Sequence, residues 1–233
     1  MKPTQFRFTG AILLLAAICG PVAAQSSPEL CGDLANGFGP HDYRVDRQHL
    51  PIVESAHFTP AVESLVRGNT SNNPLGDLDY TLRAFPNHHR ALISMMRYGE
   101  KTKSTNPGGS KRSIECYFER AVRFRPDDTV ARMLFAQYLF KLTRPDDART
   151  QLQWAAHAAK DNAFTHYNIG LIYAEAKDYP RALEQAHKAI ALGFGRTQLR
   201  EQLVAAGQWK EPDAAVAQDA AASAPASTAP AKP

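Results

Sequence analysis

Residues 129–162 read TVARMLFAQYLFKLTRPDDARTQLQWAAHAAKDN, and residues 163–196 read AFTHYNIGLIYAEAKDYPRALEQAHKAIALGFGR. Both blocks are 34 residues long, they follow each other without a gap, and small residues stand at the same three places in each. Antiparallel helices pack closely only where the side chains at their crossing are small, so this period predicts a stack of helix–turn–helix units. The matched small residues are Ala136 with Gly170, Ala148 with Ala182, and Ala155 with Ala189.

The second block also carries the residues of a known repeat. Its residues 168–173, NIGLIY, resemble the first-helix core of a tetratricopeptide repeat (TPR), and residues 178–183, DYPRAL, resemble the turn and second-helix start. The wider run from Gly76 to Gly193 is similar to an exported bacterial TPR family of unknown function, through LDYTLRAFPNHHRAL (residues 78–92) and ECYFERA (residues 115–121). The resemblance implies an all-α, right-handed TPR solenoid of about three and a half helix–turn–helix repeats. Three positions depart from the pattern: His166 replaces Trp, Ala186 replaces an aromatic residue and Phe194 replaces Pro.

Turn residues and the phase of the repeat divide the chain into units. Thr59 and Pro60 predict the start of a helix, which Gly68 would end. Residues 89–128 are longer than one period, and we assign the surplus to an inserted basic loop over residues 101–112. The predicted layout is an irregular, Gly- and Pro-containing leader (25–58), a partial repeat (59–86), three repeats (89–128, 129–162 and 163–196), a C-terminal capping helix (197–206) and a disordered Ala/Pro tail (207–233).

The N-terminus predicts export. Lys2 and Arg7 precede a short apolar run, Ala11–Cys19, and small residues before Gln25 favour cleavage after Ala24. We therefore expect residues 1–24 to be a signal peptide and the mature protein to be periplasmic or secreted. The run is shorter than the roughly 20 apolar residues of a spanning helix, so no membrane insertion is expected after cleavage. Ile18 stands where a lipobox needs a small residue, which disfavours a lipoprotein.

The cysteines indicate the redox environment of the protein, and the net charge limits the classes of partner. Cleavage would leave Cys31 and Cys116, and an oxidising compartment favours a disulfide between them. Two separately buried thiols are the alternative. The full chain has 27 basic and 23 acidic residues and a net charge of +4, which falls to +2 once Lys2 and Arg7 are removed. So small a net charge gives no reason to expect nucleic acid as a partner.

No residue pattern predicts catalysis or a cofactor. Residues 108–111 read GGSK, whereas a phosphate loop needs Gly-Lys followed by Ser or Thr between a strand and a helix. His41, His88 and His89 lack the spacing of a metal site, and we expect the adjacent pair to be a solvated helix start. No Gly-x-Ser-x-Gly motif occurs, and Cys116 stands in a helix predicted to pack. The sequence therefore predicts a protein that is not an enzyme and needs neither cofactor nor metal.

What the resemblance implies instead is a binding surface. In a TPR stack, certain first-helix positions line the concave face, and their chemistry here suits a peptide or helix of another protein. The function predicted is a non-catalytic scaffold or adaptor. The alternative is a structural subunit whose groove is filled by its own leader and which self-associates through its convex face or helix seams. The concave positions are Arg90, Ile93, Arg97, Val130, Met133, Gln137, Phe140, Lys141, Phe164, Tyr167, Leu171 and Glu175.

Overall fold

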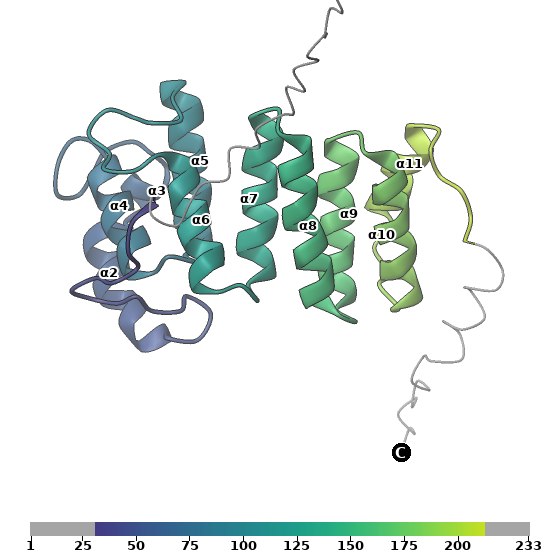
Figure 1. Ribbon diagram of the computed structural model, residues 1–233, viewed down its shortest axis with the longest axis horizontal. Coiled ribbons are helices and arrows are strands. Elements are labelled where there is room, and N and C mark those ends of the chain that lie inside the picture. The colour runs from purple at the N-terminus through teal and green to yellow at the C-terminus, as the bar shows by residue number, and fades with distance from the viewer. Residues whose placement is uncertain (1–30, 213–233) are drawn as a thin grey trace, which may run out of the picture.

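The computed structural model describes residues 31–212, and within them the protein is helical with no β-strand (Figure 1). The expected all-α class is thus confirmed. The helices stand side by side in a row that runs from α2 at one end to α11 at the other. They are α2 (Leu50–His57), α3 (Pro60–Glu63), α4 (Leu75–Ala84), α5 (His89–Thr102), α6 (Ile114–Phe124), α7 (Thr129–Lys141), α8 (Pro145–Ala159), α9 (Ala163–Glu175), α10 (Tyr179–Ala191) and α11 (Gln198–Ala205), with a 3-10 turn, η1, at Arg47–His49.

Polar side chains fix where several of these helices begin. Ser113 accepts a hydrogen bond from the Cys116 amide at the start of α6, and Asn162 accepts one from the Thr165 amide at the start of α9. Asp128 accepts from two amides at the start of α7. These caps satisfy backbone donors that the helix itself leaves unpaired. The starts of these helices are therefore encoded by the residues next to them in the sequence.

The small residues of the two blocks lie where the helices cross. Within each block the first helix packs mainly on the second, α7 on α8 and α9 on α10. The five matched alanines are buried, and so is Gly170. A Cβ atom on Gly170 would collide with the Leu199 side chain of α11 and would lie 3.4 Å from the Ala182 carbonyl oxygen. A larger residue at position 170 would therefore force the buried Leu199 side chain to shift.

One apolar core runs along the row of helices. It is continuous from Phe58 to Leu203, and its middle is an aromatic stack. The ring of Phe118 in α6 stacks on Phe135 and Tyr138 of α7, with centroids 5.6 and 5.0 Å apart. Since α6 and α7 belong to successive predicted units, this stack joins one unit to the next.

The N-terminal part differs from the sequence prediction in two ways. The leader is not irregular throughout, because η1 and α2 occupy its last residues. The prolines of the leader suggested irregular structure, but one of them, Pro51, lies in the first turn of α2, where proline's missing N–H leaves no hydrogen bond unmade. The helix that begins at Pro60 ends at Glu63, well before Gly68, and Leu65 then adopts a positive φ of 60°.

Two further boundaries shift. Helix α5 continues to Thr102, so the first residues of the expected basic loop are helical, and Lys103 ends the helix in a left-handed conformation. The expected tail does not start at residue 207, because Trp209 packs against the core and the Lys210 carbonyl oxygen accepts a hydrogen bond from His187 of α10 at 2.8 Å. The rest of the predicted tail, and the predicted signal peptide, lie outside the described residues.

Candidate functional site

Two adjoining cavities form a groove along the first helices of the units. The first, of about 730 Å³, lies over α7, α9 and α11, and we call it the apolar cavity. The second, of about 900 Å³, lies over the C-terminal ends of α5, α7 and α9, and we call it the charged cavity. Because the two cavities share lining residues, they are parts of one groove. The shared residues are Leu134, Gln137, Ile172 and Glu175.

The structure brings ten of the twelve predicted concave residues into this groove. Both cavities are lined by Gln137 and Glu175. The apolar cavity adds Val130, Met133, Phe164 and Leu171. The charged cavity adds Ile93, Arg97, Phe140 and Lys141.

The other two predicted residues have different environments. Arg90 forms an ion pair with Glu63 of α3, and its guanidinium lies over the Phe58 ring at 5.2 Å. Tyr167 is buried beneath the Phe194 ring, at a centroid distance of 4.7 Å, and its hydroxyl donates to Gln198 at 3.4 Å. Neither side chain lines the cavities, so Tyr167 is a packing residue of the C-terminal end.

Apolar side chains in the apolar cavity are accessible to a ligand. Phe164, at the start of α9, is 54% exposed, and Val130, at the start of α7, is 37% exposed. Glu175 is the single charged residue among those that line this cavity. Exposed aromatic and aliphatic groups at the centre of a concave surface are typical anchors for a protein partner.

Several groove residues were not identified from the sequence. Asn168 of α9 lines the apolar cavity, as do Gln198, Gln202 and Ala206 at the end of the row. The last three are spaced by four residues, so they lie on one face of a helix. That spacing was available in the sequence, but nothing there showed that α11 turns this face toward α7 and α9.

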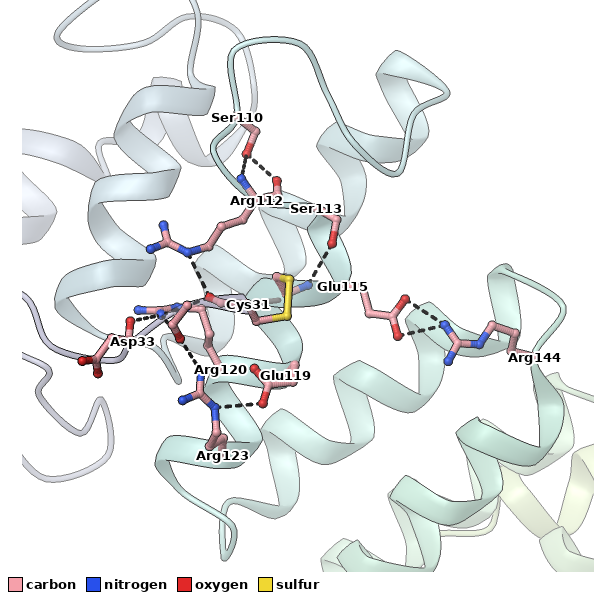
Figure 2. The surroundings of a disulfide bond; sticks show 12 residues. Cys31, Asp33, Ser110, Arg112, Ser113, Glu115, Glu119, Arg120, Arg123 and Arg144 are labelled. Atoms are coloured by element: carbon pink, nitrogen blue, oxygen red, sulfur yellow. Dashed lines mark hydrogen bonds and ion pairs between the residues drawn. A yellow bond between two sulfur atoms is a disulfide. The ribbon is translucent and has the colours of Figure 1, made fainter. Parts of the chain in front are cut away.

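Residues 31–58 of the leader lie outside the groove. Cys31 and Cys116 form a disulfide that closes a separation of 85 residues, which confirms the predicted pairing, and it fixes the leader against α6 (Figure 2). None of residues 31–58 lines either cavity. The part of the leader that the structure describes therefore leaves both cavities open.

Arginine side chains hold the leader backbone beside the disulfide (Figure 2). Arg120 is almost completely buried, and its guanidinium donates to the carbonyl oxygens of Cys31, Gly32 and Asp33. Arg123 also donates to Gly32, at 2.7 Å. Burial lowers the pKa of Arg120 to about 10, which still leaves the side chain charged at neutral pH.

The expectation of a solvated His88–His89 pair is wrong, because tertiary contacts bury His88 and pair His89, whose side chain stays 19% exposed. His88 is fully buried under Tyr43 and Phe58 and caps α5, its Nδ1 accepting from the Ala91 amide at 3.1 Å. Its Nε2 lies 3.1 Å from a Glu54 carboxylate oxygen, so the neutral ring with the proton on Nε2 satisfies both contacts. Burial lowers the pKa of His88 to about 3.

His89 joins a second buried polar cluster. Its Nε2 donates to Asp128 at 2.9 Å, and the Asn87 amide bridges Asp128 and Asp42 at 2.8 and 2.7 Å. Burial opposes the ionisation of Asp128, but the hydrogen bonds from His89, Asn87 and the α7 backbone outweigh it and leave the pKa of Asp128 below its usual value. The cluster ties the leader to the turn before α7.

The buried His88 predicts a loss of stability in mild acid. The pKa of His88 is lower in the folded than in the unfolded chain, so unfolding takes up a proton between about pH 3 and about pH 6.5. We expect the free energy of unfolding to fall by roughly 2 kcal/mol between about pH 6.5 and about pH 5. Urea unfolding at these two pH values measures this fall.

His88→Asn is the matched control, since asparagine caps a helix without titrating. The fall between the two pH values should shrink in this variant. An equal fall in both proteins would show that His88 is not the titrating group.

Among the described residues, no group of three or more histidine, cysteine, aspartate or glutamate side chains is arranged to hold a metal ion. Within residues 31–212, no helix has the length and apolar character needed to cross a membrane. Compared with known proteins, the chain matches no protein-family model, and no curated sequence is similar enough to match.

Proposed function

We propose that this protein is a non-catalytic scaffold of the bacterial cell envelope that binds a segment of another protein in the groove over α5, α7, α9 and α11. The observation that carries the proposal is the groove itself, in which Phe164 and Val130 remain exposed while residues 31–58 lie elsewhere. A structural subunit with a groove filled by its leader would cover these side chains. The openness of the groove therefore favours the scaffold over the self-filled alternative.

The helix arrangement and the sequence support the same proposal. Units of 34 residues, each with two packed helices and small residues at the crossings, support a right-handed TPR solenoid with α11 as its capping helix. The disulfide is compatible with an oxidising compartment, and the signal-like N-terminal sequence supports a site of action in the periplasm or outside the cell.

Affinity capture from the envelope fraction tests the proposal. We expect Phe164→Ala combined with Val130→Asp to lower the recovery of a partner about tenfold or more, because both side chains are exposed anchors in the apolar cavity. Trp154→Ala is the matched control. Trp154 is 56% exposed on α8 and lines neither cavity, so its loss should leave capture unchanged.

Circular dichroism of each variant shows whether it is folded. Equal recovery with the wild-type protein and the folded double variant would contradict groove binding. Loss of the partner in the Trp154 variant alone would indicate that the partner binds the surface around α8 and not the groove.

A further inference from the structure

Four carboxamide side chains from three helices line the apolar cavity, and one of them, Gln198, accepts a hydrogen bond from Tyr167. The other three belong to Gln137 of α7, Asn168 of α9 and Gln202 of α11. Within residues 31–212 none of these three forms a side-chain hydrogen bond, whereas Asn87 and His89 beside the leader are paired. They stand among exposed apolar groups such as Phe164 and Val130. A partner that covered those groups would also cover the carboxamides, which would then need hydrogen bonds.

The hydrogen-bonding groups of a carboxamide distinguish an extended ligand segment from a helical one. It donates and accepts at the same time, as a peptide group does. A helix has already paired its backbone groups internally, but an extended chain offers free N–H and C=O groups along its length. Side chains that can pair with both groups, spread over α7, α9 and α11, therefore match an extended segment better than a helix.

The charged cavity adds a requirement at the other end of the groove. Two of its acidic residues are already neutralised, Glu100 by Lys141 at 2.7 Å and Asp178 by Arg149 at 2.8 Å. The remaining cations, Arg97 and Lys177, form no ion pair within residues 31–212. Glu175 is the third acidic residue of this lining, so the four cations exceed the acidic residues by one positive charge, which attracts an acidic group of the ligand.

The position of Glu175 determines which end of the groove an acidic ligand residue would occupy. It is the single charged residue among those lining the apolar cavity, and it lies where the two cavities join. An acidic ligand residue in the apolar cavity would meet Glu175 with no cation beside it. In the charged cavity the same residue would also meet Glu175, but there Arg97 and Lys177 belong to the same lining and compensate for it.

We infer that the groove binds an extended polypeptide segment with apolar side chains over Val130 and Phe164, a backbone paired by Gln137, Asn168 and Gln202, and an acidic residue at the end over Arg97 and Lys177. This inference rests on the proposed function and specifies the class of its partner.

Selection from a display library tests it. Random linear peptides of about 12 residues, long enough to cross a groove of several helices when extended, are selected on the purified protein with its disulfide intact. Enriched peptides should carry apolar residues toward one end and Asp or Glu toward the other. The affinity of a synthetic consensus peptide is then measured by fluorescence anisotropy.

Changes in the peptide separate backbone recognition from side-chain recognition without altering the protein. Methylation of backbone nitrogens in the apolar half should weaken binding about tenfold, since each methyl removes a donor. Replacing the acidic residues by Gln should weaken binding about fivefold in the wild-type protein and have little effect in Arg97→Glu. Gln137→Leu and Asn168→Leu should lower the affinity while circular dichroism stays unchanged.

The outcomes distinguish this inference from the function on which it rests. Enriched peptides that bind as helices, tolerate methylation or lack acidic residues would overturn the inference, while their loss of binding to Phe164→Ala would leave the groove function standing. A library that yields no binder overturns the inference, and the capture experiment then decides the proposed function separately. Binders unaffected by Phe164→Ala would contradict both.

Discussion

Replacing Phe118 by alanine should lower the free energy of unfolding by about 3–5 kcal/mol, the range for truncating a buried aromatic side chain. Phe118 is completely buried in α6, and its ring stacks on Phe135 and Tyr138 of α7. The truncation removes the apolar contacts that join one predicted unit to the next and leaves a cavity that rigid helices cannot close. Urea unfolding followed by circular dichroism measures the change.

Phe164→Ala provides the matched control. The same side chain is removed, but Phe164 is 54% exposed, so the free energy of unfolding should change by less than about 1 kcal/mol. Similar losses in the two variants would contradict the assignment of Phe118 to the core and of Phe164 to the groove.

The second large effect is expected from the disulfide. Replacing both Cys31 and Cys116 by alanine opens a loop closed over 85 residues. The chain-entropy account gives a loss of about 4 kcal/mol for a loop of this length, because the unfolded chain gains conformational freedom. Urea unfolding of the oxidised wild-type protein and of the double variant measures the loss.

A reducing agent gives the internal control. It should lower the stability of the wild-type protein and leave that of the double variant unchanged. The arginine contacts with the leader carbonyls do not depend on the disulfide, so we expect the reduced protein to remain folded at neutral pH. A wild-type protein whose unfolding midpoint does not change on reduction would contradict the stabilising role of the cross-link.

The comparison of sequence and structure shows which features are encoded locally. The helix starts at Ser113, Asp128 and Asn162 are encoded locally, because a cap acts on amides two or three residues away. The leader was predicted to be irregular throughout because proline, as at Pro51, is compatible both with irregular structure and with the first turn of a helix, and only the packing of α2 on α4 decides between them.

The environments of His88 and His89 depend on contacts distant in the sequence. His88 meets Glu54 and His89 meets Asp128, at separations of 34 and 39 residues. No local sequence pattern predicts such pairs, so the sequence favoured a solvated helix start. The groove was largely predictable because the repeat fixes which positions of a first helix share a face. Tyr167 occupies such a position but does not line the groove, because Phe194 and α11 cover it at the end of the row.

The most direct test of the proposed function is photo-crosslinking from the groove. A photoreactive phenylalanine analogue replaces Phe164, and the same analogue at Trp154 serves as the control on the outer helices. After irradiation of intact cells, the account predicts a crosslink from position 164 to a segment of another protein, and none to that segment from position 154. Crosslinks from position 164 to this protein's own chain alone would contradict the account and favour the self-filled structural subunit.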